Sequence, residues 1–188
     1  VACLMAVGAG FFAGYALSRF QFVGKYVIMF LILVTQMVAV SMIIIPMFRT
    51  IIALNLFDSR LAVIITVSAM PVPMVTWLLK NYLDTIPVEL EEAAAVDGCS
   101  KIGALFRILL PVAVPGVVTS IIIAFTNTYN QFFIPMVFLS SFNKYPALVG
   151  VYTMSSELVP PWHLVMAACL VILIIPLTVF FFCQRYVM

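Results

Sequence analysis

Charged residues are scarce in this sequence. Asp, Glu, Lys and Arg make up 9% of its 188 residues, whereas soluble domains carry roughly 25%. The apolar fraction is 65% and the mean hydropathy is +1.25, and these values exclude a soluble globular domain. The formal net charge of +2 is spread along the chain, so no basic patch of the kind that binds nucleic acid is present. These absences place the chain in a lipid bilayer.

Sequence motifs for catalysis are also missing. There is no G-x-x-x-x-G-K-[ST] loop for nucleotide phosphates and no H-E-x-x-H zinc motif. Four cysteines follow no metal-ligand spacing, and we interpret them as small apolar side chains: Cys3, Cys99, Cys169 and Cys183. We therefore expect a non-enzymatic chain that holds no metal and no cofactor of its own.

Long uncharged runs fill most of the chain, and each is long enough to cross a membrane as a helix. Lipid offers no hydrogen-bond partners, and the runs lack the apolar/polar alternation of barrel strands, so we predict helices. The predicted helices cover residues 1–17, 26–48, 61–79, 112–131 and 163–182. Prolines in or near them, such as Pro46 and Pro71, are expected to bend them. The fold class is thus an all-α polytopic membrane protein, with residues 1–188 forming one domain.

The predicted spans contain no Asp, Glu, Lys or Arg, and His163 lies only at a membrane edge. Ion-coupled secondary transporters usually carry ionisable residues inside the bilayer. That class therefore becomes the weaker alternative, and a membrane enzyme is weaker still because paired carboxylates are absent from the spans.

One segment, residues 81–110, is dense in charge. Pro87 suits a first helical position, and Glu89, Glu91 and Glu92 then complement the positive end of a helix of about ten residues. Gly98 is expected to end this helix in a left-handed conformation, and Ser100 to cap a second helix that runs from Lys101 toward Arg107. We predict a helix-turn-helix at the membrane surface, although a solvated loop with a helix-friendly composition is the simpler alternative.

The spacing of this segment is Glu92-Ala93-Ala94, three residues, Gly98, nine residues, and Ile108-x-Leu110-Pro111. It resembles the cytoplasmic coupling loop of bacterial ABC importer permeases. The resemblance implies a six-helix permease fold, of which five helices are present here and one N-terminal helix would precede them. It also implies that the loop docks on an ATPase through the following residues: Glu91, Glu92, Ala93, Ala94, Asp97, Gly98 and Pro111.

Other segments are similar to the maltose-type carbohydrate permeases, among them Gly14-Tyr15-Ala16-Leu17-Ser18-Arg19-Phe20 and Trp77-Leu78-Leu79-Lys80. This resemblance implies a permease of the bacterial inner membrane that moves a sugar or oligosaccharide. Its expected partners are a second permease subunit in a heterodimer, two ATPase subunits that bind ATP and Mg, and an extracytoplasmic solute-binding protein. A polyol or sugar phosphate is the alternative cargo. The chain departs from the family at Tyr129-Asn130-Gln131-Phe132, where the family usually has an acidic residue.

Polar residues near the spans could line the substrate path or serve as hydrogen-bonding glue between helices. The candidates are Gln36, Asn127, Tyr129, Asn130 and Gln131. With residues 81–110 in the cytoplasm, Arg19, Lys25, Lys80, Lys101, Arg107 and Arg185 lie inside and Arg49, Arg60 and Lys144 outside. This distribution follows the positive-inside rule.

The segment Ser140 to Trp162 is too polar and too rich in proline to span, and it is predicted to lie outside. In maltose-type permeases the corresponding loop reaches the docked binding protein, so the resemblance implies contacts through Gly150, Val151, Tyr152 and Thr153. A lid over the outer mouth of the pore is the alternative role.

Overall fold

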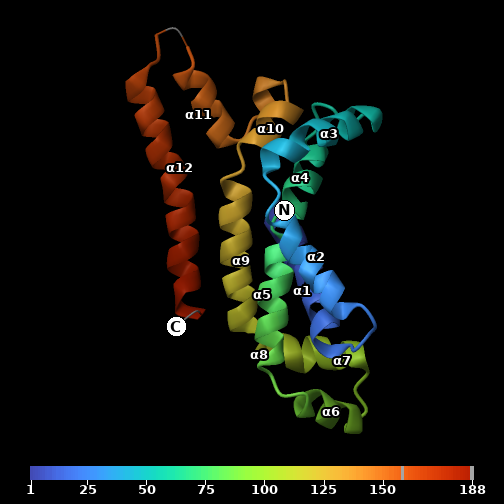
Figure 1. Cartoon of the computed structure of the whole chain (residues 1–188). Helices are drawn as coiled ribbons and strands as arrows, with labels where there is room; N and C mark the ends of the chain where they lie inside the picture. The colour runs from blue at the N-terminus through green and yellow to red at the C-terminus, as the bar shows by residue number, and fades with distance from the viewer. Residues whose placement is uncertain (158, 187–188) are drawn as a thin grey trace.

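The computed structural model describes residues 1–157 and 159–186, and every regular element within them is a helix (Figure 1). The predicted domain, residues 1–188, also includes Leu158, Val187 and Met188, which lie outside the described residues. The helical elements, in chain order, are α1 (Ala2–Arg19), α2 (Lys25–Thr35), α3 (Val40–Ala53), α4 (Arg60–Ala69), α5 (Val72–Asp84), α6 (Glu89–Val96), α7 (Lys101–Ala104), η1 (Leu105–Leu109), α8 (Leu110–Val112), α9 (Val114–Tyr129), α10 (Phe133–Phe138), η2 (Phe142–Lys144), α11 (Ala147–Ser155), α12 (Trp162–Cys183) and η3 (Gln184–Tyr186).

Two described helices, α1 and α12, are singly long and apolar enough to cross a membrane, and they match the predicted helices 1–17 and 163–182. Three further candidates are bent pairs, which brings the total to as many as 5. The expected number of spans therefore agrees with the structure only if each bent pair is one span.

The predicted helix 26–48 is wrong as a single rod, because α2 and α3 meet at 98°. The break falls at Gln36–Ala39, ten residues before the proline expected to cause a bend. Thr35 Oγ1 donates to the carbonyl of Ile32 at 2.7 Å, a local bond that competes with the helical ladder. Irregular backbone at membrane depth is tolerated where it lines a cavity, and Gln36 and Val38 line one.

The predicted helix 61–79 is also two helices, since α4 and α5 are bent by 42°. Pro71 precedes α5 and Pro73 lies in its first turn, where the missing N–H groups and the fixed φ interrupt the ladder from α4. The second helix continues to Asp84, five residues beyond the predicted end. This extension carries the polar residues Lys80 and Asp84, which form an ion pair at 2.6 Å one helical turn apart.

The predicted helix 112–131 corresponds to α9, which begins after a 78° bend at Ala113 and ends at Tyr129. Asn130 and Gln131 consequently lie in the connection beyond the helix. The uncharged run continues into α10, a short helix that the sequence analysis did not separate from its surroundings.

The main core joins α1, α5 and α9, with η1 closing one end; Phe11, Leu79 and Leu109 belong to this core. Gly10 and Gly14 let α1 approach α5 closely. A Cβ built on Gly14 would lie 3.1 Å from the backbone of both Thr76 and Lys80. Such close packing at small residues drives helix association in membranes, because lipid tails are as apolar as the side chains and the hydrophobic effect therefore does not favour association.

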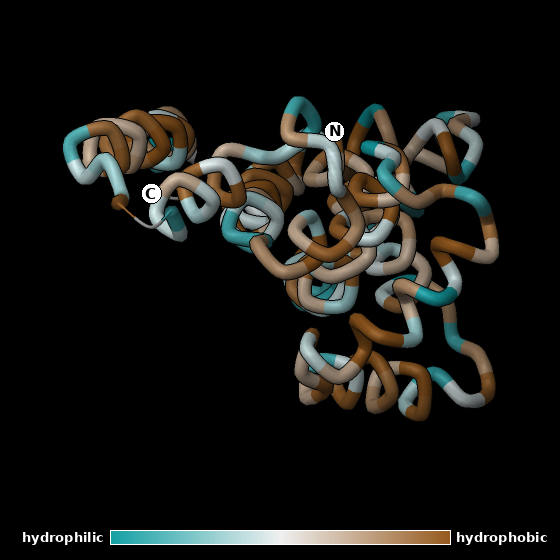
Figure 2. Tube along the Cα trace, turned by 90° about the horizontal axis from the view of Figure 1, so that it is seen from above, coloured by the Kyte–Doolittle hydropathy of each residue, from teal (hydrophilic) through white to brown (hydrophobic). Residues whose placement is uncertain are grey.

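A second core lies at the opposite end, where Ile134 and Phe138 of α10 are fully buried against α3 and α4. Helix α12 stands apart from both cores at one edge of the molecule (Figures 1 and 2), and Val165 is its one buried residue. Helices α6 and α10 lie at opposite ends of the bundle (Figure 1), which we call the α6 end and the α10 end.

Candidate functional site

Helix α6 projects from one end of the bundle (Figure 1), and its local sequence explains its length. Glu89, Glu91 and Glu92 lie in its first turn, where carboxylates complement the partial positive charge of the helix end. The helix has 8 residues rather than about ten, because it begins at Glu89 instead of Pro87.

Gly98 ends α6 as the sequence predicts. Its φ is 84°, in the left-handed region that a residue with a Cβ adopts only at a cost. The amide of Gly98 donates to the carbonyl of Ala95 at 3.1 Å and that of Cys99 to Ala94 at 2.9 Å. These two bonds form a Schellman motif, which satisfies the last carbonyls of the helix and turns the chain back toward the membrane.

Ser100 then caps α7 by accepting from the amide of Gly103 at 3.1 Å. The second helix does not end near Arg107, as expected, but continues through η1 and α8 to Val112. Pro111 explains the wide π-helical turn η1, because a proline removes one ladder bond and its ring crowds the carbonyl four residues earlier. Pro111 therefore shapes the elbow between α7 and α9 and lies off the α6 surface.

Glu91, one of the three glutamates of α6, is bonded to α1. Glu91 Oε1 lies 2.5 Å from Arg19 Nε, and Glu91 Oε2 accepts from the Tyr15 hydroxyl at 3.1 Å. Arg19 Nη2 also donates to the carbonyl of Ile86 at 3.0 Å. We call Tyr15, Arg19, Ile86 and Glu91 the Arg19 cluster. It ties α6 to the end of α1, so Glu91 is turned toward the bundle.

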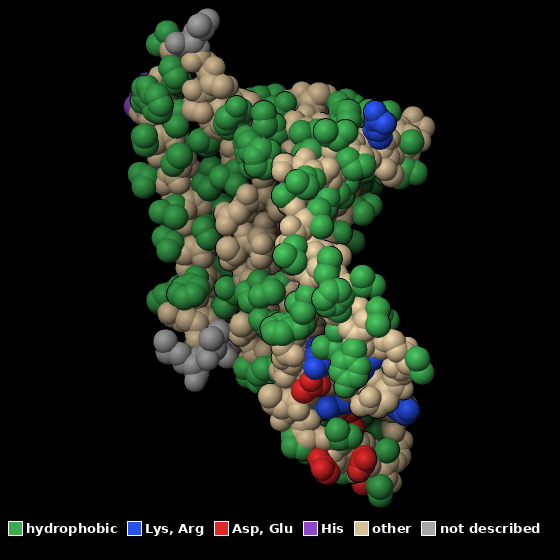
Figure 3. Space-filling view, in the orientation of Figure 1, with side chains coloured by type: hydrophobic (Ala, Val, Ile, Leu, Met, Phe, Trp, Pro, Cys, Tyr) green, Lys and Arg blue, Asp and Glu red, His purple; other side chains and the backbone are tan. Residues whose placement is uncertain are grey.

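Glu92 and Ala93 of α6 are exposed, as is Asp97 directly after the helix, and Val96 is 88% exposed. Glu92 has no ion-pair partner within the described residues. Ala94 alone of the helix is buried. Figure 3 shows acidic and basic side chains gathered at this end of the molecule. Of the predicted docking residues, Glu92, Ala93 and Asp97 share an exposed surface, Glu91 and Ala94 hold the helix in place, and their docking role stays a prediction.

A cavity of about 380 Å³ lies beside the Arg19 cluster and is lined by residues of α1, α6 and α7. Arg19, Glu91, Glu92 and Lys101 contribute polar atoms to its lining. Lys101 Nζ lies 5.6 Å from the ring centroid of Phe20, a cation–π distance.

Three of the predicted substrate-path residues come together at the α2–α3 break. Gln36, Asn127 and Gln131 line one cavity of about 360 Å³, although they come from three segments of the chain. Asn127 Nδ2 donates to the carbonyl of Ile123 at 2.9 Å. The described lining contains no charged side chain, so the cavity offers amide and hydroxyl groups to an uncharged polar molecule.

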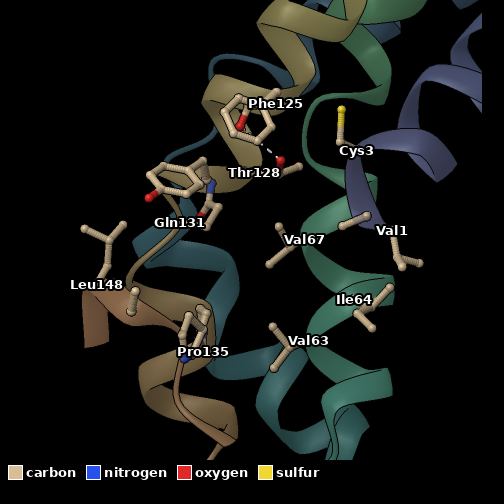
Figure 4. A pocket seen from close by; sticks show the side chains of 14 residues that line it. Val1, Cys3, Val63, Ile64, Val67, Phe125, Thr128, Gln131, Pro135 and Leu148 are labelled. Carbon is tan, nitrogen blue, oxygen red and sulfur yellow. Dashed lines mark hydrogen bonds between the residues drawn. The ribbon is translucent and has the colours of Figure 1, made fainter. Parts of the chain in front are cut away.

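Gln131 also reaches a neighbouring cavity of about 300 Å³. Figure 4 shows Gln131 and Thr128 on one side of it, with Cys3 of α1 and Val63 and Val67 of α4 across from them. Most of this lining is apolar. Gln131 therefore lies between the two cavities, on the connection that follows α9.

The remaining two candidates face α12. The Tyr129 hydroxyl donates to the carbonyl of Ile172 at 2.7 Å, and Tyr129 stacks on Phe125 with 5.3 Å between ring centroids. Asn130 lines a separate cavity of about 280 Å³ against α11 and α12. Tyr129 thus makes the bond between helices that was the alternative role, and it also lines the cavity of about 300 Å³ that Gln131 reaches.

The predicted binding-protein contacts lie on α11, a helix within the segment Ser140 to Trp162 for which no secondary structure was predicted. Val151 faces the cavity beside α12, and Thr153 bonds the carbonyl of Gly150 at 2.8 Å. Tyr152 is exposed and packs edge-on against Phe132, with 4.9 Å between centroids. Only Tyr152 of the four presents a largely exposed side chain.

Sequence reasoning missed a second polar cluster, at the α10 end. Asp58 accepts from the amides of Ser140 and Ser141, from Ser141 Oγ at 2.6 Å and from Lys144 Nζ at 2.5 Å. The hydrogen bonds from Lys144 and Ser141, then those from the backbone, hold the pKa of Asp58 well below its usual range. We call Asp58, Ser140, Ser141 and Lys144 the Asp58 cluster.

The role of Gly10 and Gly14 was missed as well, although the sequence does contain a signal for it. Gly10-x-x-x-Gly14 is the G-x-x-x-G spacing that lets membrane helices approach closely. Arg19 was noted only as a basic residue at the end of a span, and its partner Glu91 lies 72 residues away. Such a pairing follows from the packing of α1 on α5 and not from local sequence.

Residues 6–188 match a protein family described as binding-protein-dependent transport system inner membrane component. The chain is 34% identical to the inner membrane ABC transporter permease protein YcjP of Escherichia coli (strain K12) over 171 residues, which cover 91% of this chain and 61% of that protein. It is 36% identical to the sulfoquinovosyl glycerol transport system permease protein SmoH of Agrobacterium fabrum, covering 89% of this chain and 58% of SmoH. The chain thus spans about three fifths of the length of these relatives.

A solved structure shares the fold. It is described as the crystal structure of a bacterial ABC transporter involved in the import of the acidic polysaccharide alginate. The TM-score is 0.78 at 24% sequence identity, and the match covers 99% of this chain and 71% of the chain in that structure. The overall helical arrangement is therefore one that another protein also adopts.

Proposed function

Because the chain belongs to the family of binding-protein-dependent transport system inner membrane components, we propose that it is a permease subunit of an ATP-driven importer that moves a sugar or oligosaccharide across the bacterial inner membrane. The single observation that carries the proposal is the family match over residues 6–188. The chain acts as one half of a channel and does no chemistry itself. A second permease subunit completes the channel, and two partner ATPase subunits bind ATP and Mg.

In this proposal the exposed face of α6 is the docking surface for the ATPase. Glu92 offers an unpaired carboxylate, and Ala93 beside it leaves room for close approach. Charge-assisted hydrogen bonds between a carboxylate and an arginine are strong and directional, which suits a joint that must transmit force. Closure of the ATPase pair would move α6, and the helices would rock between inward-facing and outward-facing arrangements.

An uncharged carbohydrate is supported by the lining of the cavity at the α2–α3 break. The amides of Gln36, Asn127 and Gln131 can donate and accept hydrogen bonds with hydroxyl groups. A sugar phosphate would require a cation there, and the described lining has none. The relative SmoH is named for sulfoquinovosyl glycerol, a sugar derivative that carries a sulfonate, so its name supports a carbohydrate cargo but not the absence of charge.

Uptake by the assembled complex tests the proposal. The chain is co-expressed with its partner permease and ATPase, reconstituted in proteoliposomes, and supplied with solute-loaded binding protein. We expect uptake of labelled oligosaccharide that requires MgATP and the binding protein. Uptake driven by a proton or sodium gradient without ATP would instead support the secondary-transport alternative and contradict the proposal.

The orientation is testable separately with an impermeant thiol reagent. Ser100 follows α6 and Ser156 follows α11, and both are exposed. In a background without the four native cysteines, Ser100→Cys should react from the cytoplasmic side and Ser156→Cys from the outer side. Reaction of both from one side would contradict an odd number of spans between them.

A further inference from the structure

The end of α1 contacts the end of α5, the connection that leads into α6, and α6 itself. Arg19 bonds Glu91 of α6 and the carbonyl of Ile86, which lies in the connection from α5. Ser18 Oγ donates to Asp84 at the end of α5 at 2.6 Å. The last two residues of α1 therefore contact the chain immediately before α6 and α6 itself.

The Arg19–Glu91 pair is well enclosed. Its side chains are 10% and 15% exposed, and the Tyr15 hydroxyl fills a further acceptor site of Glu91. Apart from this pair, α6 packs on α7 and η1 through the small side chain of Ala94. Arg19 and Tyr15, both bonded to Glu91, thus form the polar link between α6 and α1, in addition to the covalent connections at the two ends of α6.

Helix α1 extends from this link to the cavities. Its 18 residues span about 27 Å at 1.5 Å per residue. Gly10 and Gly14 seat it against the backbone of α5, so the two helices move as one body. At its other end Cys3 lines the cavity shown in Figure 4, and Cys3 Sγ lies 3.6 Å from the carbonyl of Ile121 in α9.

We propose that Arg19 is a positioning residue that transmits displacement of α6 to α1, and through α1 to the wall of the cavity lined by Cys3 and Gln131. The inference rests on the proposed function, because it assumes that a partner moves α6. The carbonyl of Ile86 and the carboxylate of Glu91 bind different nitrogens of one planar guanidinium, so α6 and its entry segment are held in a fixed relation to α1. A lysine would have to bind both acceptors from its single nitrogen, which lacks the fixed fork of the guanidinium.

The test measures the solute imported per ATP hydrolysed by the reconstituted complex. Arg19→Gln should leave subunit assembly and ATP hydrolysis near normal and lower this ratio about tenfold. Arg19→Lys should lower it by a smaller factor, and the exchange of Arg19→Glu with Glu91→Arg should restore part of it. Lys80→Gln is the matched control, since it removes a charge whose ion pair lies within α5 alone, and it should leave the ratio unchanged.

A normal ratio in Arg19→Gln would overturn the inference. If the Arg19→Gln complex does not assemble, the same ratio is measured in Tyr15→Phe, which removes one hydrogen bond to Glu91 and keeps the ion pair. Loss of assembly in both variants would also overturn the inference, because the cluster would then be a folding contact only. If the unmodified complex shows no ATP-driven uptake, the proposed function fails instead, and the two failures are distinguished.

Discussion

The two ends of the bundle each carry one polar cluster, and the clusters are built differently. The Arg19 cluster joins two helices, and its ion pair is 10% and 15% exposed. The Asp58 cluster joins two connections, with Lys144 37% and Asp58 20% exposed. Asp58 itself adopts a left-handed φ of 56°, typical of a tight connection.

The difference shows what each cluster can do. An enclosed pair between rigid helices keeps its geometry when one helix moves, so it can transmit motion. A more open cluster among loops fixes only the loops, since an exposed ion pair contributes little and relaxes easily. We therefore expect changes at the α6 end to alter the coupling of the whole chain, and changes at the α10 end to stay local.

The largest effect is expected where α1 rests on α5 beneath the Arg19 cluster. Gly14→Val places a Cβ 3.1 Å from the backbone atoms Thr76 O and Lys80 N, which cannot move without displacing α5. Overpacking of this kind costs about 3 kcal/mol. The apparent melting temperature of the purified protein should fall.

Gly8 supplies the control for Gly14→Val, because a Cβ on Gly8 of the same helix meets nothing within 4 Å. Gly8→Val should change the melting temperature little. An equal fall in melting temperature for Gly8→Val and Gly14→Val would mean that the close approach of α1 and α5 does not contribute specifically to stability.

Breaking the Arg19 cluster itself should have the next largest effect. Glu91→Ala leaves Arg19 enclosed without its carboxylate partner, a loss of about 2 kcal/mol for a pair that is partly open to solvent. Amide hydrogen exchange in α6 should become about 30-fold faster, while exchange in α12 stays the same. Glu92→Ala is the control, because Glu92 is exposed and its replacement should leave amide exchange in α6 unchanged. Equally fast exchange in the Glu91→Ala and Glu92→Ala variants would contradict the different roles of these two glutamates.

A smaller effect is expected at the turn that ends α6. Gly98→Ala forces a Cβ into the left-handed region at φ 84°, at a cost of about 1 kcal/mol. Nothing lies within 4 Å of the new atom, so the cost is conformational and not steric. Exchange should accelerate at the amides of Gly98 and Cys99, and Gly98→Asn, which tolerates this conformation better, should do less harm. Equal exchange rates in Gly98→Ala and Gly98→Asn would contradict the claim that the left-handed φ at this position determines the cost.

The smallest effect is expected at the Asp58 cluster, and it should depend on pH. The folded-state pKa of Asp58 is lowered from its ordinary value of 3.8, so its contribution is present above that value and is lost as the pH falls through the folded-state pKa. Protection of residues 139–145 from proteolysis should stay constant from pH 8 to about pH 5 and fall only in stronger acid. Asp58→Asn should lower protection at neutral pH and remove the acid response, and an unchanged response would contradict the assignment.

Sequence reasoning predicts the regular parts of this fold and misses what depends on packing. Helices α1 and α12 follow from uninterrupted apolar runs, and the turn at Gly98 follows from local chemistry. The break at Gln36 was not predicted, because hydropathy records burial in lipid and not the direction of the axis. The sequence does mark Gln36 as a polar candidate, but its place beside Asn127 and Gln131 emerges only from the packing of the helices.

The candidate site divides in the same way. Glu92 and Ala93 are exposed on a helix that the sequence predicts, but the sequence gives two adjacent glutamates no distinguishing mark. Arg19 selects Glu91 through a contact that spans 72 residues, and Asp58 meets Lys144 across 86. Contacts of this range depend on which helices pack together, so they emerge only from the assembled fold.

The central claim is that the exposed face of α6 docks on an ATPase while Glu91 stays turned toward α1. A photo-crosslinking residue at Val96, which is 88% exposed, tests it most directly in the assembled complex. The account predicts a crosslink to the ATPase subunit whose yield changes when ATP is added, and none from the same residue placed at Phe142, which is 65% exposed at the α10 end. A crosslink to the ATPase from Phe142 and not from Val96 would contradict the account.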